Sequence, residues 1–178
     1  MSNGMPVFAD LTEYSYHPGA EAERPKNVGW LGPSGTFDVR APAPDFLERL
    51  WQYCQVWVAH ARGVHTCPLC LPARSVVAER DGKYLLLGAA EIRVVSRAGK
   101  MYAAPNLIYH YVAVHHYAPP AEFEQAVMTG LSPSNQEYLD RLSQLGLSWH
   151  SEPASAEKPV PFLFVRTPDG GVKRVEES

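Results

Sequence analysis

Residues 62–72 read RGVHTCPLCLP, and this stretch contains two cysteines separated by two residues, Cys67 and Cys70. A turn of this spacing lets both thiolates face one centre at ~2.3 Å, and a zinc ion then needs two further nitrogen or sulfur ligands. The chain has three cysteines in all, which is too few for the disulfide framework of a small secreted protein. The stretch therefore predicts a structural zinc ion bound in a zinc-knuckle loop.

Histidines must supply the remaining ligands, because the third cysteine, Cys54, falls in the apolar stripe of a predicted helix. His65 lies two residues before the first cysteine of the pair and is the predicted third ligand. His110, on a later predicted helix, is the predicted fourth. His115 lies on the same helix, but five residues span ~7.5 Å of helical rise, so we expect only one of the two to bind the ion. His115 and His60 are then reserve ligands or neighbours of the site.

Two other interpretations of the cysteine pair remain open. Residues 66–70 read TCPLC, which resembles a glutaredoxin-type dithiol. Such a thiol is activated by the N-terminus of a following helix, whereas the sequence after Cys70 predicts a strand. The pair could also be two inert buried thiols. The zinc interpretation is favoured, and the order of knuckle, hairpin and ligand-bearing helix resembles a treble-clef zinc site.

Hairpin and helix signals on either side of the cysteines predict the elements of the fold. A helix is expected from Pro44 to about Ala61, where apolar residues share one side and Gly63 follows. Asp81-Gly82 predicts a tight hairpin turn, and a second hairpin follows it. The expected strands are 75–79, 84–87, 91–95 and 101–102, the later helices are 105–117, 120–128 and 132–145, and a late hairpin or loose tail covers 162–165 and 172–175.

The predicted fold class is α+β, with a small antiparallel sheet of hairpins packed against three or four helices, a zinc-knuckle loop and an extended N-terminal arm. Residues 1–130 are expected to form a single zinc-containing domain that includes the arm. Residues 131–178 are expected to add a C-terminal helix, a linker and a hairpin or tail. Proline and glycine interrupt residues 1–42 too often for a helix.

Three aromatic residues of the arm, Tyr14, Tyr16 and Trp30, have two interpretations. Buried aromatic side chains would anchor the arm on the domain. Exposed ones would offer a binding surface, since aromatic residues contribute strongly to protein interfaces. Anchoring is the favoured interpretation, and these residues are also the candidate contact surface.

Composition and charge exclude several classes of protein. The formal net charge of −3 and the absence of a lysine or arginine cluster argue against a nucleic-acid partner. No apolar run approaches the ~18 residues of a transmembrane helix, and the first residues lack a basic and hydrophobic leader. The sequence therefore predicts a cytoplasmic protein without a membrane partner.

Several strings resemble those of an uncharacterised family of short bacterial proteins over about Phe8 to Met128. They are DLTxY at 10–14, NVGWL at 27–31, RGxHxCxxC at 62–70, EIRV at 91–94 and YxAPxLIxHYVxxHxYxPP at 102–120. The resemblance implies a compact domain that contains the cysteine pair and both helix histidines, with an extension after Gly130. It implies no substrate, partner or catalytic residue.

Two functions follow from these observations. The first is a zinc-stabilised, non-catalytic module that binds another protein, for example as an accessory or immunity-type protein. It is favoured because four protein ligands leave no position for a catalytic water and because the HExxH and GxSxG strings are absent. The alternative is a small metal-dependent hydrolase or acid–base enzyme, whose pocket would use His65, Glu91, Arg93, Tyr102, His110 and His115. Against it, we expect Glu91 and Arg93 to form an ion pair on a solvated strand face.

Overall fold

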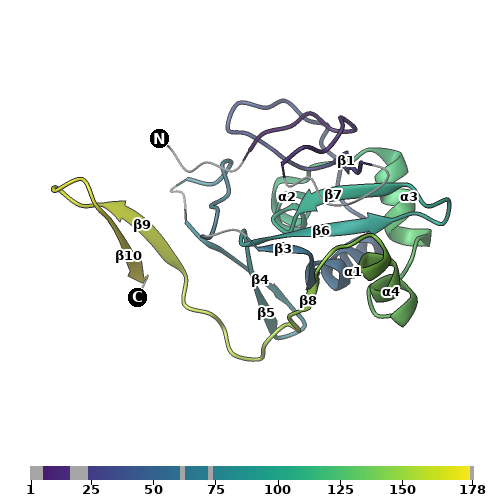
Figure 1. Ribbon diagram of the computed structural model, residues 1–178. Coiled ribbons are helices and arrows are strands. Elements are labelled where there is room, and N and C mark those ends of the chain that lie inside the picture. The colour runs from purple at the N-terminus through teal and green to yellow at the C-terminus, as the bar shows by residue number, and fades with distance from the viewer. Residues whose placement is uncertain (1–5, 17–23, 61–62, 72–73, 177–178) are drawn as a thin grey trace.

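The computed structural model describes residues 6–16, 24–60, 63–71 and 74–176, and it has the predicted α+β fold class (Figure 1). The helices are α1 (Pro44–Cys54), α2 (Ile108–His115), α3 (Ala121–Thr129) and α4 (Gln136–Gln144). The strands are β1 (Lys26–Asn27), β2 (Val56–Trp57), β3 (Ala59–His60), β4 (Val76–Arg80), β5 (Lys83–Leu87), β6 (Ala90–Val95), β7 (Met101–Pro105), β8 (His150–Ser151), β9 (Phe162–Arg166) and β10 (Val172–Glu176).

The central sheet has the strand order β1-β7-β6-β3. β6 and β7 form an antiparallel hairpin whose register runs from Glu91 opposite Pro105 to Val95 opposite Met101. Every residue of both strands is buried, so this hairpin lies in the middle of the protein. β3 pairs antiparallel with β6, whereas β1 pairs parallel with β7. The sheet is therefore mixed, because the N-terminal arm joins its edge in the parallel direction.

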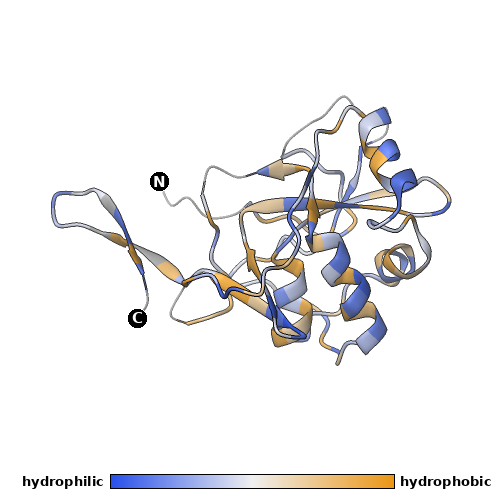
Figure 2. Ribbon diagram, turned by 90° about the horizontal axis from the view of Figure 1, so that it is seen from below, coloured by the Kyte–Doolittle hydropathy of each residue, from blue (hydrophilic) through white to orange (hydrophobic). Residues whose placement is uncertain are grey.

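The helices pack against this hairpin and against one another. α1 contacts α2, α3 and β6, and Leu50 and Tyr53 of α1 are fully buried. Tyr138 of α4 meets the ring of Tyr53 edge-on at 5.7 Å and donates a hydrogen bond of 2.6 Å to the carbonyl of Arg93. In Figure 2 the helices carry both hydrophobic and hydrophilic residues, as amphipathic helices on a core do.

The N-terminal arm is anchored on the β6–β7 hairpin by its aromatic side chains. Tyr14 and Trp30 are buried, and the Trp30 indole donates a hydrogen bond of 3.0 Å to the carbonyl of Ala103. Tyr16 is 37% exposed and packs edge-on against Trp30 at 5.7 Å. Of the three aromatic residues considered as a contact surface, Tyr16 is therefore the exposed one.

Glu91 and Arg93 differ from the solvated ion pair that the alternating strand predicts. The two side chains are almost fully buried, and the Arg93 guanidinium lies 2.9 Å from the Glu91 carboxylate. The Tyr14 hydroxyl donates to the same carboxylate oxygen at 2.6 Å, and its ring lies 4.7 Å below the guanidinium carbon. The strand pattern could not show this burial, because the cover comes from an arm about 77 residues away in sequence.

α1 ends at Cys54, earlier than the predicted end near Ala61, which lies outside the described residues. The residues that follow Gln55 instead form the short strands β2 and β3. β2 pairs with β8, and β3 pairs with β6. β-branched and aromatic residues suit strands, and here distant pairing partners outweigh the helical periodicity.

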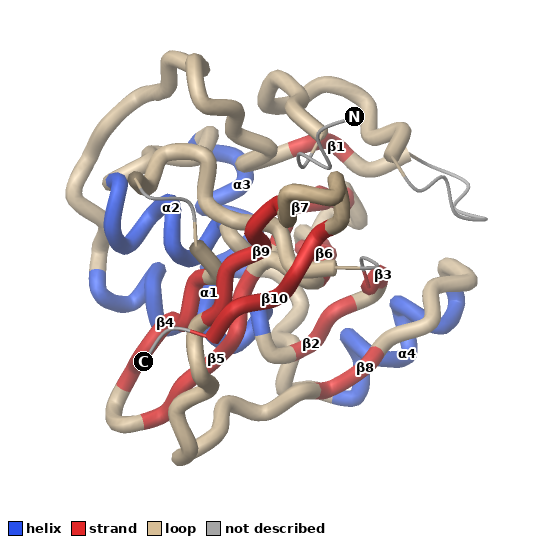
Figure 3. The backbone as a smooth tube through the Cα atoms, turned by 90° about the vertical axis from the view of Figure 1, so that its left-hand side faces the viewer, coloured by secondary structure: helices blue, strands red, loops and turns tan. Residues whose placement is uncertain are grey.

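The C-terminal segment after α4 contacts β2, β5 and Ser75 and ends in a separate hairpin. β8 pairs with β2, and Ser155 exchanges backbone hydrogen bonds with Tyr84 of β5. The first residue of β9, Phe162, donates its amide to the Ser75 hydroxyl at 2.8 Å. From there β9 and β10 pair with each other and project from the rest of the protein, as Figure 1 shows; in Figure 3 the same hairpin lies in front of the other strands. The predicted late hairpin is present.

Candidate metal centre

The cysteine loop (residues 63–71) presents both thiols of the knuckle on one side. Cys67 is fully buried and Cys70 is half-buried, and neither forms a disulfide. The Cys70 amide donates to the Cys67 carbonyl at 3.4 Å, and the Leu69 amide points at the Cys67 sulfur at the same distance. Amides directed at a sulfur favour its thiolate form, which is the form that binds metals.

Contacts with the segment after β5 hold this loop in place. The His65 amide donates to the Gly88 carbonyl at 2.8 Å, and the Gly88 amide donates to the buried Asn106 side chain at 2.7 Å. Gly88 has a φ of 96°, and a Cβ at this position would lie 2.1 Å from the His65 carbonyl oxygen. Only glycine fits such a backbone. Asn106 precedes α2, so these contacts bring the cysteine loop to the helix that carries the histidines.

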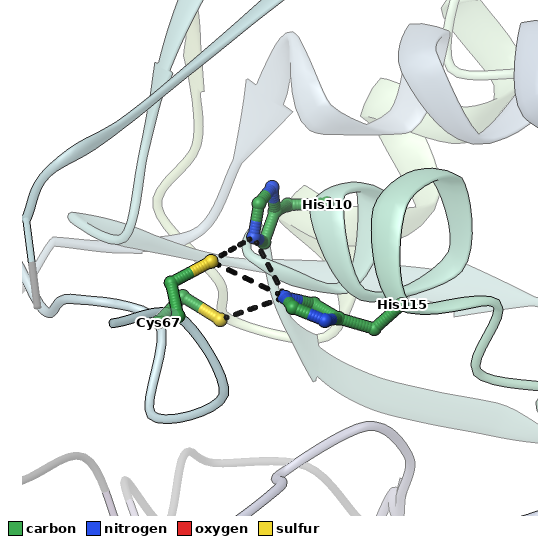
Figure 4. Close-up of side chains that lie close together, drawn as sticks. Cys67, His110 and His115 are labelled. Carbon is green, nitrogen blue, oxygen red and sulfur yellow. Dashed lines mark hydrogen bonds between the residues drawn. The ribbon is translucent and has the colours of Figure 1, made fainter. Parts of the chain in front are cut away.

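α2 supplies two imidazoles that face the thiols. The Nε2 atoms of His110 and His115 lie 3.2 Å apart. The Cys70 sulfur lies 3.3 Å from both of these nitrogens, and the Cys67 sulfur lies 3.3 Å from that of His115. Figure 4 shows the two thiols and the two imidazoles pointing toward one another across the gap between loop and helix. All four donor atoms lie within 4.8 Å of one another.

These separations match the edges of a zinc tetrahedron. With Zn–S near 2.3 Å and Zn–N near 2.0–2.1 Å, tetrahedral geometry places sulfur and nitrogen about 3.6 Å apart and the two nitrogens about 3.3 Å apart. The observed distances of 3.3 Å and 3.2 Å are close to both values. Two thiols and two imidazoles in this arrangement can hold a tetrahedral metal ion, and zinc is the usual occupant of such a donor set.

The electrostatic environment suits metal binding better than thiol redox chemistry. Burial lowers the pKa of His110 to about 4, with a smaller contribution from His115, whose own pKa burial also lowers. Both imidazoles are therefore neutral near pH 7, as a ligand must be. Burial also raises the pKa of Cys67 to about 11. A redox nucleophile needs a lowered thiol pKa, so this cysteine requires a cation to become a thiolate.

The structure places His115 in the group of donors and leaves His65 out of it. His110 is in the group, whereas His60 is exposed on β3 and packs against Trp57, with ring centroids 5.0 Å apart. The helical rise separates the backbones of His110 and His115, but each Nε2 atom lies several Å from its own Cα. Two imidazoles that turn toward each other can therefore close the gap, and their Nε2 atoms lie 3.2 Å apart. Closeness in sequence favoured His65, but its imidazole is not among the four side chains whose donor atoms converge.

The residues of the alternative enzyme pocket are dispersed. Glu91 and Arg93 form the buried network with Tyr14, and Tyr102 packs edge-on against Phe123 of α3 at 5.7 Å. Among the described residues, the one group of three or more histidine, cysteine or acidic side chains with converging donor atoms is the cluster of Cys67, Cys70, His110 and His115. The described helices also include none that is long and apolar enough to cross a membrane.

Comparisons with known proteins find a match to a family of uncharacterised proteins. No curated protein and no solved structure matches the chain. A family whose members have no established function matches residues 6–128, a span that contains all four donor residues, the described part of the arm, helices α1 and α2, and all of α3 but its last residue. The match stops before α4, β8 and the β9–β10 hairpin. The chain belongs to the family described as Domain of unknown function (DUF7919).

Proposed function

We propose that this protein is a zinc-stabilised, non-catalytic module that binds another protein. The observation that carries the proposal is the convergence of Cys67, Cys70, His110 and His115, whose donor atoms lie within 4.8 Å of one another. Four protein ligands saturate a tetrahedral zinc ion, so no position remains for the water that a hydrolytic zinc activates. A zinc ion with four protein ligands therefore supports a structural role rather than a catalytic one.

The place of the cluster in the fold supports the same role. The two cysteines lie 40 to 48 residues before their histidine partners, and the described contacts between the cysteine loop and the start of α2 run through Gly88 and Asn106. An ion at this position would join two elements that are distant in sequence, as structural zinc does in small domains. Thiolate ligands also suit a reducing compartment, so we propose a cytoplasmic location.

Exposed apolar residues beside the cluster support a protein partner. Leu71, next to Cys70, is 94% exposed, and Val114, next to His115, is 57% exposed. Both belong to the elements that carry the donors, so the ion would hold them in a fixed relation. Single exposed aliphatic residues are common on soluble proteins, and the proposal therefore requires a direct test of binding.

The test combines metal analysis with partner capture. Native mass spectrometry of the purified chain should show one zinc ion per chain, and affinity capture from the native host should return a partner in stoichiometric amount. A Leu71→Ser/Val114→Ser variant should keep its zinc and lose that partner. Zinc binding without any stoichiometric partner would refute the binding role and leave the metal site intact.

A further inference from the structure

A groove of about 980 Å³ lies between the N-terminal arm and the segment that joins α2 to α3. It is separate from the four donor atoms of the metal centre, although one wall begins at Tyr117, two residues after His115. The groove lies within the residues that match the family, 6–128. Its size is that of a site for a small organic molecule.

Aromatic rings form much of the wall of this groove. Phe8 and Trp30 make one edge-on pair, and Phe37 and Tyr117 make another, each with ring centroids 5.7 Å apart. All four residues line the groove, but Trp30 and Tyr117 are 2% and 1% exposed, so the accessible ring surface is that of the half-buried Phe8 and Phe37. Aromatic rings carry a negative face that attracts cations.

The carboxylates in the groove exceed the positive charge that is available to neutralise them. Asp10 accepts hydrogen bonds from the Gly29 amide at 2.9 Å and from the Tyr117 hydroxyl at 2.7 Å, so its side chain is fixed in the wall. Asp38 is exposed, and no hydrogen bond or ion pair engages its carboxylate among the described residues. The one guanidinium in the lining, that of Arg40, is already paired with Glu124 of α3.

An anionic ligand fits this groove less well. The N-terminus of α3 borders the groove at Ala121, and a helix N-terminus attracts anions. Glu122 and Glu124 occupy its first turn, however, and already complement the helix dipole. Since Arg40 is engaged by Glu124 as well, no unbalanced positive charge remains in the described lining.

We propose that the groove binds a small organic cation of the alkylammonium or quaternary ammonium class. The charged nitrogen lies beside Asp38, and the apolar substituents lie against the half-buried rings of Phe8 and Phe37. This inference goes beyond the proposed protein-binding role and does not depend on it, because Asp38 and the aromatic pairs belong to neither the donor cluster nor the Leu71 and Val114 surface.

The test is a titration of the zinc-loaded, ¹⁵N-labelled full chain, followed by amide and indole shifts. The probes are choline, its uncharged isostere 3,3-dimethylbutan-1-ol, and the anion 3,3-dimethylbutyrate. We expect shifts at the groove residues and a dissociation constant for choline at least about fivefold lower than that for the alcohol. Added salt should weaken the binding of choline and leave that of the alcohol unchanged.

Two matched variants test the role of the carboxylate. Asp38→Asn should raise the dissociation constant of choline by about three- to fivefold and leave that of the alcohol unchanged. Asp140→Asn, at an exposed aspartate of α4 away from the groove, should change neither. Equal binding of choline and the alcohol, preference for the anion, the absence of any shift at the groove, or unchanged choline binding in Asp38→Asn would each overturn the proposal. Zinc content, measured on the same samples, reports the metal site independently.

Discussion

Replacing His115 with alanine should remove one of the four donors of the metal centre. Its Nε2 atom lies 3.3 Å from both cysteine sulfurs and 3.2 Å from the other imidazole, so it would occupy one corner of the proposed metal tetrahedron. Structural zinc binds with about 10–16 kcal/mol in small domains. Divided among four ligands, this gives about 2.5–4 kcal/mol per ligand, or a dissociation constant higher by roughly 10²- to 10³-fold.

Competition with a chromophoric zinc chelator under reducing conditions at pH 7 measures this change. Two control variants make the test specific. His65→Ala removes the histidine closest in sequence to the cysteines, and His116→Asn alters the next residue of the helix end while tolerating its φ of 56°. Both controls should bind zinc within about threefold of the original chain, a difference well under 1 kcal/mol.

The opposite pattern would refute the reasoning. If His65→Ala weakened zinc binding by the larger factor and His115→Ala left it unchanged, the ligand set inferred from the structure would be incorrect. The loop histidine favoured by sequence spacing would then be the true ligand. If both variants bound as the original chain does, neither imidazole would contact the ion.

Three further predictions concern stability. Arg93→Met should lower the free energy of unfolding by about 3–5 kcal/mol because it removes the guanidinium that lies 2.9 Å from the buried Glu91 carboxylate. Thermal unfolding measures this change, and the control Arg24→Met, at an exposed ion pair, should cost under about 1 kcal/mol. The second prediction concerns pH. Burial lowers the pKa of His110 to about 4, so between about pH 6.5 and 4 the unfolded chain binds more protons at this histidine than the folded chain does. Stability should therefore fall as the pH drops through this window, and a flat urea midpoint over the same range would contradict the assignment. Gly88→Ala should destabilise the fold by more than about 1 kcal/mol, since its Cβ would meet the carbonyl of the cysteine loop at 2.1 Å; an unchanged urea midpoint would contradict that close approach.

The parts of the fold that depend on local signals could be predicted from the sequence. Asp81 and Gly82 both take positive φ at the predicted turn, and β4 and β5 pair around them. α3 and α4 lie where proline, glycine and apolar spacing place them. The end of α1 could not be predicted in this way, because the residues after Cys54 pair with strands about 30 to 95 residues later.

The residues of the candidate site also differ in whether local sequence or tertiary packing determines them. Cys67 and Cys70 could be identified by their spacing alone, since a turn brings both thiols to one side. The choice of histidines depends on how the cysteine loop packs against α2. The contacts of Gly88 with His65 and Asn106 determine this packing, and they could not be predicted from the sequence. The reach of the imidazole was the sequence-level consideration that could have kept His115 as a ligand, because a backbone rise of ~7.5 Å does not by itself keep two such side chains apart.

Native mass spectrometry of the full chain, purified under reducing conditions without added metal, tests the central claim most directly. The account predicts one zinc ion per chain, retained in His65→Ala and lost or strongly reduced in Cys67→Ser. A folded chain that carries no metal, or one in which the two sulfurs of the knuckle form a disulfide, would contradict it.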